Sequence, residues 1–535
     1  MSYLDTIHNL ATDPEQLELT YQQAVQTGDG DAFAEAIDAG YTKAGDNLLL
    51  AAWHYRLAYA AAAAKKRVIA WSWAIPLGLL NGLLLWLLSD DQRFTIQMTN
   101  PLTGQAHDIL PAVALLAAPI SAAVMVLFLA LAGKGRLDRA LAVILGLAVA
   151  VAYVLLLFSN IWPRAFQEQY LTLMVMHLAL LAWAAVGVVA LAKKRDARNR
   201  FAFLVKSLEA FVVFGLFAIA GGLFTSITFG LFSALDIEPP DVVIRLFLAG
   251  GAGLIAIIAL ALVYDPTLAP ARQSFDEGLS KLVAMLMRLL LPLSVLVLLV
   301  YLAFIPFNFR EPFENREVLI IFNAMLFAVM ALMVGATPVR ENELGDQAQT
   351  WLRRGIIALA ALSLIVSLYA LAAILYRTSI DRPTPNRLTF IGWNVINIGV
   401  LVVLLVRQWR AGRSRWLPAM HSTFATGMVP YVIWTLVVIL VLPWLFRGDP
   451  AQVAHLPTRV QQIVFDEADP ILLKCGSSPH IYLLEDGEKR WVKDIATFKA
   501  EGFRWSDVEF IRCDDLRDVP DGPTIPPGAG PPPQP

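Results

Sequence analysis

Hydrophobic residues dominate this chain in eleven long stretches separated by short polar connections. Most of the stretches carry no charge over the roughly 20 residues that a helix needs to cross about 30 Å of hydrocarbon. They lack the alternating pattern of a barrel strand, and a single lipid-exposed segment can pair its own backbone groups only as a helix. The pattern therefore predicts an all-α polytopic transmembrane bundle. The expected spans are residues 68–88, 110–132, 140–161, 171–192, 208–235, 242–264, 282–305, 318–336, 355–376, 388–406 and 424–446.

Positive charge is distributed unequally between the two sets of connections. One alternate set carries twenty Lys and Arg residues, and the opposite set carries seven. Because Lys and Arg are retained on the cytoplasmic side, we expect a cytoplasmic N-terminus and, with an odd number of spans, an extracytoplasmic C-terminus. A polar stretch precedes the first span and the short basic start of a signal peptide is missing, so we expect no cleavable signal.

Residues 1–67 are expected to form a cytoplasmic helical domain. Thr12-Asp13-Pro14 is a helix start with proline in the first turn, Gly28 ends that helix, and Asp31 opens a second that runs to Gly40. A third begins near Asp46. The domain either shields the first span and makes subunit contacts, or it binds a dedicated cytoplasmic partner.

Polar side chains inside the spans are the main candidates for function, because burying them in lipid is costly. Asn394 and Asn397 lie one helical turn apart, and no Asp or Glu falls in the central part of a span, which argues against a proton-coupled transporter. Amides and hydroxyls at this depth either join helices by hydrogen bonds or line a transport path. The membrane-interior polar candidates are Asn394, Asn397, Asn323, His177, Arg288, Thr225, Ser226 and Thr228.

Four of the ionisable residues have simpler interpretations. Arg288 is near enough to the cytoplasmic side to reach the headgroups, and Lys206 with Glu209 forms an i,i+3 pair at the membrane boundary. We expect His177 to be a packed, hydrogen-bonded histidine, because no second His, Cys or carboxylate stands at ligand spacing. No metal site or cofactor is expected.

The fifth span carries a ladder of small residues at every fourth position. Such a ladder lets another helix approach closely, so an oligomer through Gly222, Ser226 and Gly230 is one interpretation. The cluster from Gly250 to Gly253 makes the sixth span the expected neighbour of the fifth. The ladder consists of Ala218, Gly222, Ser226, Gly230 and Ala234.

The composition changes after Phe446, and residues 447–522 are expected to form a small α+β module outside the cytoplasm. Two strand-like runs flank an Asp-Gly pair at Gly487, a further strand is expected at residues 508–511, and Asp494 is a helix cap. Cys475 and Cys513 are the only cysteines, so they are either a disulfide or two buried thiols. Residues 523–535 are expected to be a disordered proline-rich tail.

This module resembles a short repeat of bacterial surface and secreted proteins, which implies an outside location but no activity. The residues that carry the resemblance are Tyr482, Gly487, Arg490, Phe498, Gly502, Trp505, Val508, Leu516, Pro520 and Gly522.

The membrane part resembles an uncharacterised family of bacterial polytopic membrane proteins, a domain of unknown function with a Thr-x-Asn-Arg motif entering a late span. Here Asp381-Arg382-Pro383 stands where that family often has Tyr-Gly-Leu. The matching segments are Phe313-Glu314-Asn315-Arg316 followed by Asn323, and Thr384-Pro385-Asn386-Arg387 followed by Gly392-Trp393-Asn394.

Arg387 of this motif is a cation on the side with few positive charges, so we infer that a specific group holds it there. Its expected partner is Glu311, Glu314, a helix carbonyl end or a lipid phosphate; the alternative is an arginine that only marks the headgroup boundary. Asn386 and Arg316 are the other motif candidates.

Two functional interpretations follow for an integral protein of a bacterial inner membrane. In the first, the chain is a sensor, scaffold or envelope-assembly factor whose outer module engages an envelope polymer or protein. In the second, it is a transporter or flippase for a small molecule or lipid, with spans five and ten lining the path. The signatures of metalloproteases, serine hydrolases and phosphate-binding loops are missing, so an enzyme is less expected, and nothing indicates nucleic-acid binding.

Overall fold

The structure is a computed structural model, and it divides the chain into two compact units, Met1–Ala70 and Trp71–Pro535. Within some described elements the side chains are not described, among them those of Glu314 and Arg316. The described residues are 3–27, 29–43, 46–64, 69–99, 106–161, 163–275, 278–314, 316–380, 383–447, 453–466, 470–485 and 487–534.

The first unit is helical, as the sequence predicts. Asp13 accepts hydrogen bonds from the backbone of the first turn of the second helix, and Asn47 caps the fourth through Leu50. Apolar side chains of Phe33, Ile37 and Trp53 close a small core. The helices are α1 (Tyr3–Asn9), α2 (Pro14–Thr27), α3 (Gly30–Lys43) and α4 (Leu48–Ala64).

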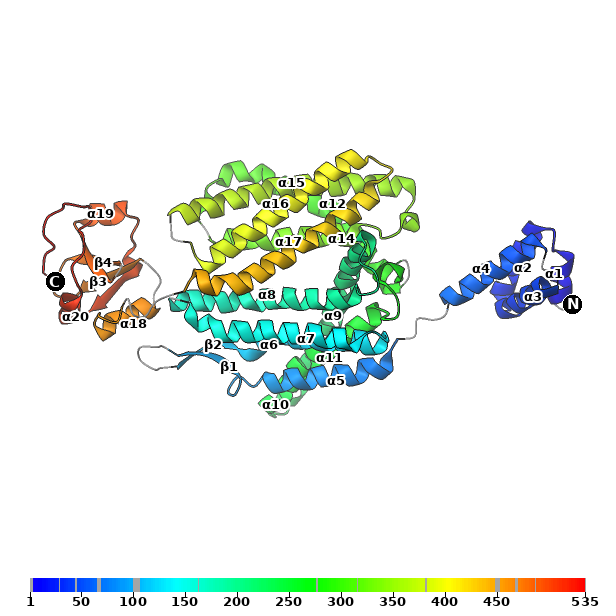
Figure 1. Cartoon of the computed structure of the whole chain (residues 1–535), viewed down its shortest axis with the longest axis horizontal. Coiled ribbons are helices and arrows are strands. Elements are labelled where there is room, and N and C mark those ends of the chain that lie inside the picture. The colour runs from blue at the N-terminus through cyan, green and yellow to red at the C-terminus, as the bar shows by residue number, and fades with distance from the viewer. Residues whose placement is uncertain are drawn as a thin grey trace. The chain divides into compact units, whose positions relative to one another are not determined.

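The second unit is built mainly from long apolar helices that run side by side (Figure 1). Ten helices of the described chain are long and apolar enough to cross a membrane, which confirms the polytopic helical class. A further apolar helix, α14 (Arg316–Ala336), matches the eighth expected span. Its described apolar segment, Ile321–Ala336, is shorter than those of the ten. The ten are α5 (Trp71–Leu88), α6 (Ala112–Ala132), α7 (Leu137–Leu157), α8 (Arg164–Ala190), α9 (Ala197–Ser233), α10 and α11 (Asp241–Arg245 and Gly251–Val263), α12 (Gly278–Phe304), α15 (Asp346–Ile380), α16 (Pro385–Ala411) and α17 (Trp416–Leu445).

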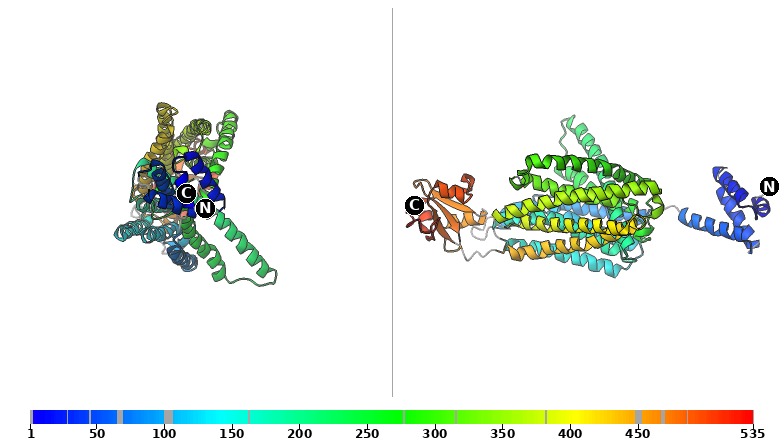
Figure 2. Two further views of the ribbon diagram at one scale, coloured as in Figure 1. Left: turned by 90° about the vertical axis from the view of Figure 1, so that its right-hand side faces the viewer. Right: turned by 90° about the horizontal axis from the view of Figure 1, so that it is seen from above.

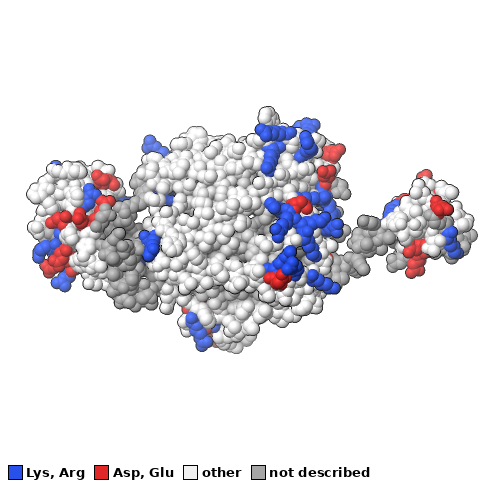
Figure 3. Space-filling model, viewed as in Figure 1, with Lys and Arg blue, Asp and Glu red and all other residues white. Residues whose placement is uncertain are grey.

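One end of this bundle is strongly basic. Figure 3 shows Lys and Arg gathered there on the face in view. The loops of this end also bind one another: Lys193 donates to the carbonyl of Thr267 at 2.7 Å, and Arg340 donates to the carbonyl of Gln273 at 3.0 Å. The connections that the sequence assigns to one side of the membrane therefore share one end of the fold.

At the other end, α5 and α6 are joined by a β-hairpin that the sequence did not predict. Its strands are β1 (Thr95–Thr99) and β2 (Ala106–Pro111), which pair antiparallel with an irregularity between Ile96 and Gln97. The short helix α13 (Glu311–Glu314) precedes α14 at this end.

The glycine cluster at Gly250 packs on α5, and the sixth span also lies beside the fifth, as expected, since Val213 of α9 packs with Ala259 and Val263 of α11. A Cβ atom added to Gly82 would lie 2.7 Å from the Gly250 carbonyl oxygen, and one added to Gly253 would lie 2.9 Å from the carbonyl oxygen of Asn81. The Asn81 amide donates to the Gly253 carbonyl at 2.8 Å. Backbones of α5 and α11 therefore touch because both carry glycine at the crossing point.

The small-residue ladder instead lies on a part of α9 that leaves the body of the bundle. In Figure 2 the second half of α9 leaves the body of the bundle together with the helix that follows it in the chain, and Phe224 and Phe229 of α9 contact Phe247 there. Positions 222 and 230 have open space around them: no heavy atom lies within 4 Å of a Cβ added to Gly222 or Gly230. The described chain therefore leaves space for another helix at these two ladder positions, and an oligomer through Gly222, Ser226 and Gly230 stays a prediction.

After the bundle the chain forms a module with a four-stranded sheet in the order β5-β4-β3-β6. The predicted hairpin is present, with Gly487 at φ +80°, and Asp494 accepts a hydrogen bond from the Thr497 backbone at 2.7 Å. Strand β6 pairs parallel with β3. The elements are α18 (Thr458–Asp466), β3 (Ile471–Cys475), β4 (Ile481–Glu485), β5 (Glu488–Val492), α19 (Ile495–Ala500), β6 (Val508–Ile511) and α20 (Cys513–Asp518).

A disulfide joins β3 to the start of α20, between Cys475 and Cys513, with an S–S distance of 2.15 Å. The expectation of a disordered tail from Pro523 is wrong for its described part. The Ile525 N–H donates to the carbonyl of Trp491 in β5 at 2.8 Å, and its carbonyl accepts from the N–H of Lys493, the residue after β5, at 3.0 Å. The Ile525 side chain is buried, and this burial is what holds a proline-rich segment against the sheet.

Candidate functional site

A cluster of buried polar side chains lies where α8, α14, α16 and α17 meet. His177 Nδ1 lies 2.7 Å from the Leu173 carbonyl oxygen, and His177 Nε2 lies 3.2 Å from the indole nitrogen of Trp393. A carbonyl only accepts and an indole N–H only donates, so Nδ1 carries the proton and Nε2 is the acceptor. The ring is therefore a neutral tautomer fixed by both neighbours, and it does not offer a free nitrogen to a metal.

The same cluster uses the two amides of α16. The Asn394 side chain donates to the Asn323 side-chain oxygen and to the Phe390 carbonyl, each at 2.8 Å. The bond to Asn323 joins α16 to α14, and the bond to Phe390 stays within α16. The phenol of Tyr431 donates to the side-chain oxygen of Asn397, which joins α17 to α16. All of these amides are buried, so the bonds are protected from water and lipid.

We call His177, Asn323, Trp393, Asn394, Asn397 and Tyr431 the central polar cluster. The ring of Trp393 holds it together, because it stacks on Tyr431 at 5.4 Å between centroids and meets His177. In the described structure, Asn394 Oδ1 and Asn397 Nδ2 have no hydrogen-bond partner. The arrangement acts as a helix-joining network of neutral groups with no carboxylate to carry charge.

The hydroxyls of α9 do not belong to this cluster. Thr225 donates to the Gly221 carbonyl and Thr228 to the Phe224 carbonyl, each at 2.8 Å, so both hydroxyls bond to the preceding turn of their own helix. Ser226 is exposed. The expectation that Thr225 and Thr228 join two helices is wrong, since a threonine on a helix can satisfy its hydroxyl locally.

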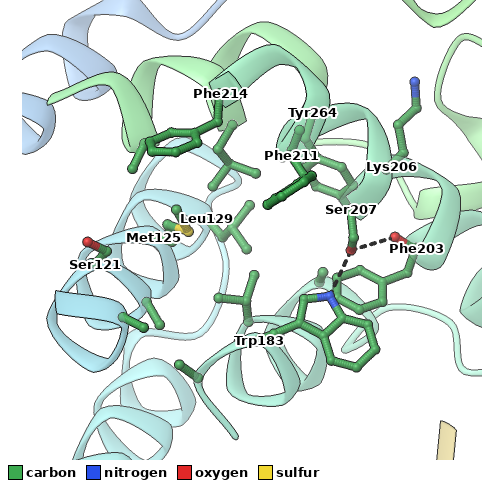
Figure 4. Close-up of a pocket in the computed structure, with 18 of the residues that line it drawn as sticks. Ser121, Met125, Leu129, Trp183, Phe203, Lys206, Ser207, Phe211, Phe214 and Tyr264 are labelled. Carbon is green, nitrogen blue, oxygen red and sulfur yellow. Dashed lines mark hydrogen bonds between the residues drawn. The ribbon is translucent and has the colours of Figure 1, made fainter. Parts of the chain in front are cut away.

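A lateral cavity of about 270 Å³ lies between α6, α8, α9 and α11. In Figure 4, Trp183 and Phe203 border its lower side and Phe214 the upper, and the Trp183 indole donates to Ser207 at 3.0 Å. Alanines leave the space open, because several wall positions carry only a methyl group. These alanines are Ala118, Ala122, Ala179, Ala182, Ala190, Ala210 and Ala256.

Lys206 borders this cavity with its carbon chain, and its charge points away (Figure 4). Its ammonium group donates to Glu209 Oε2 at 2.7 Å and to the Ser280 hydroxyl at 3.0 Å, and Ser280 donates to Glu209 at 2.8 Å. The side chains of Lys206 and Glu209 are 2% and 4% exposed. The predicted i,i+3 pair is present, and it also ties α9 to the start of α12.

Arg288 is held at the basic end of the bundle. Its Nε donates to the Ala336 carbonyl at 3.1 Å and its guanidinium pairs with Glu343 at 3.2 Å. It borders a separate cavity between α12 and α15. Of the four cavities described in this structure, none is lined by Asn394, Asn397 or Thr225.

The Thr-x-Asn-Arg motif is the N-terminal cap of α16. The Thr384 hydroxyl accepts a hydrogen bond from the Arg387 N–H at 3.3 Å, Pro385 occupies the first helical position, and Asn386 is half-buried beside it. Arg316 is the first residue of α14. The partner of the Arg387 side chain stays a prediction.

Sequence reasoning missed three residues of these sites. Trp393 was named only as part of the motif resemblance and Tyr431 was not named, because large aromatic residues are common in membrane helices. Asn81 was passed over although it is a polar residue inside an apolar span. Asn81 bonds to α11 and, at 3.0 Å, to Ser121. Within the described ranges, no group of three or more His, Cys, Asp or Glu side chains is placed to hold a metal ion. Comparison of the chain with protein families, curated proteins and solved structures gives no match.

Proposed function

We propose that this protein is a scaffold or sensor of a bacterial cytoplasmic membrane, with its N-terminal helices inside and its disulfide-bonded module outside. One observation carries the proposal: the polar groups at the bundle centre bond to one another and line none of the four cavities described. The chain also forms a separate compact unit before the bundle and a module with its own hydrophobic core after it.

The orientation is supported by the basic end of the bundle and by the disulfide. Positive connections stay in the cytoplasm, and disulfides persist mainly in oxidising compartments. An alkaline phosphatase fusion after Arg447 is expected to be active, and a fusion after Arg200 inactive. The opposite pattern would contradict the proposed topology.

The outer module is expected to engage envelope material through exposed apolar side chains. Ile495, Trp505 and Phe510 are each more than half exposed, and Trp505 is backed by a stacked Phe498 ring at 4.8 Å. The full chain in detergent should sediment with purified peptidoglycan sacculi, and a variant that ends at Arg447 should not. Equal sedimentation of the two proteins would remove the outer module from the proposal.

The lateral cavity favours a second candidate function, a carrier for a lipid. Its apolar wall and its place between membrane helices suit an acyl chain. The test is scrambling of a fluorescent phosphatidylcholine in proteoliposomes. If the protein is a scaffold, proteoliposomes should scramble the lipid no faster than protein-free vesicles. Faster scrambling that is abolished by Ala210→Trp, which fills the cavity, would favour the carrier.

A further inference from the structure

A cavity of about 600 Å³ lies between α12 and α15, with two arginines in an otherwise apolar wall that continues deeper into the bundle. Both helices begin at the basic end of the bundle. Arg288 and Arg354 line the part nearer those beginnings, and Val295 and Ala358 lie about one to two turns deeper. The cavity is therefore amphipathic along the direction in which a lipid lies.

The floor of the cavity is closed by a direct contact of the two helices. A Cβ added to Gly355 would lie 2.5 Å from Leu291 Cδ2, so the Leu291 side chain rests on the α15 backbone. The outer face of α12 is open, since Leu289 is 70% exposed and Leu293 is 53% exposed. In a membrane these leucines face lipid, and Trp351, which lines the cavity, is exposed beside it, so the cavity wall reaches the surface of the bundle.

The first cation is fixed before any ligand arrives. The recorded bonds of Arg288 to Ala336 and Glu343 use two of its five N–H groups. Glu343 is itself held, because its other oxygen accepts the N–H groups of Val339 at 2.9 Å and Arg340 at 2.8 Å. A guanidinium restrained in this way keeps donors at the cavity wall and loses little entropy on binding.

The second cation carries the net charge of the site. Within the described residues, Arg354 has no recorded ion pair, and its guanidinium lies 5.2 Å from the centre of the Trp351 ring. Trp351 is 63% exposed, and exposed tryptophan is typical of the headgroup level of a membrane. Since Glu343 offsets Arg288, the unpaired Arg354 makes the cavity electropositive.

We propose that this cavity binds one anionic phospholipid, with its phosphate between Arg354 and Arg288 and one acyl chain along Leu291, Val295 and Ala358. Guanidinium groups bind phosphate oxygens bidentately, and basic pockets between helices suit anionic headgroups. A free phosphate would make no contact with the apolar wall, and a lipid without net charge would not neutralise Arg354. The proposal holds whether the bundle is a scaffold or a carrier.

Native mass spectrometry of the detergent-purified full chain tests the site. The protein is incubated with dioleoylphosphatidylglycerol or, separately, with dioleoylphosphatidylcholine at equal concentration. We expect one phosphatidylglycerol to be retained about tenfold better than phosphatidylcholine, and Arg354→Gln to remove most of that preference, as loss of one charge-assisted contact implies. Arg354→Lys should retain an intermediate amount, because it keeps the charge without the planar fork.

Two matched variants separate this site from general surface charge. Arg410→Gln removes an exposed cation from the same end of the bundle without touching the cavity and should leave retention unchanged. Ala358→Trp fills the apolar end, keeps both arginines and should lower retention severalfold, with melting temperatures checked for all variants. Equal loss from Arg354→Gln and Arg410→Gln overturns the proposal. So does retention unaffected by Ala358→Trp, or equally tight binding of glycerol phosphate alone.

Discussion

The contact between α5 and α11 predicts a sharp difference between two glycine-to-alanine substitutions. In Gly82→Ala the new methyl group would lie 2.7 Å from the Gly250 carbonyl oxygen and 3.5 Å from the Leu254 nitrogen. Weak C–H···O contacts have C···O distances of about 3.3–3.6 Å, so the helices have to separate by roughly half an ångström or more. Gly222→Ala on α9 meets no atom within 4 Å and is the matched control.

The magnitude follows from opposing effects. Overpacking costs about 1–3 kcal/mol, and lengthening the 2.8 Å bond from Asn81 to Gly253 costs about 0.6 kcal/mol more. Alanine gains about 1 kcal/mol over glycine in helix propensity. We therefore expect Gly82→Ala to lower the free energy of unfolding by about 0.6–2.6 kcal/mol and Gly222→Ala to leave it unchanged or raise it by up to about 1 kcal/mol.

Unfolding by SDS in mixed micelles, followed by tryptophan fluorescence, measures both variants against the parent. The reasoning is refuted if Gly82→Ala is as stable as the parent, because the backbone contact would then not exist at the stated distance. It is equally refuted if the two substitutions change stability by the same amount, because only propensity would then be acting.

Three more predictions concern the central polar cluster and the outer module. Asn394→Leu leaves the Asn323 oxygen without its donor and should lower the free energy of unfolding by about 1–3 kcal/mol. Adding Asn323→Leu should recover part of this loss, and a double-mutant cycle with zero coupling would contradict the 2.8 Å bond. Replacing Cys475 and its partner by alanine opens a link across 38 residues and should destabilise the module by about 4 kcal/mol, measured by hydrogen exchange. Burial raises the pKa of Tyr482 to about 12, with a smaller contribution from the Asp521 charge. The neutral phenol therefore stabilises the module below pH ~10, and this stability is lost as the pH rises toward 12. In Tyr482→Phe that dependence should disappear from a denaturation series, and its persistence would assign the titration to another group.

Much of the fold could be predicted from hydrophobic runs and caps, because both are local. The expected spans overlap the ten long apolar helices and α14, and Asp13, Asp494 and Gly487 lie at the ends or turns expected of them. The β1–β2 hairpin was missed although residues 93–99 alternate between polar and apolar, which is the pattern of a half-buried strand.

Contacts between helices were harder to predict, because spacing identifies a small or polar face without identifying what it meets. The glycines at 250–253 fit the ladder of α9 as well as Gly82 of α5, and the structure uses α5. Asn323, Asn394 and His177 were predicted to lie inside the membrane. Their meeting with Trp393 depends on the order of helices around the bundle, which one sequence does not give.

The segment that lies along β5 also determines how the outer sheet can grow. Backbone N–H groups of Gly522 and Ile525 point toward β5 and are used there, and the intervening Pro523 and the following Pro526 have no N–H to offer outward. A further strand approaching this side would find missing donors, which is how natural sheets avoid edge-to-edge polymerisation. In the described sheet the opposite edge strand, β6, has no neighbour on its outer side. An extended peptide that adds to the sheet can therefore pair only with β6.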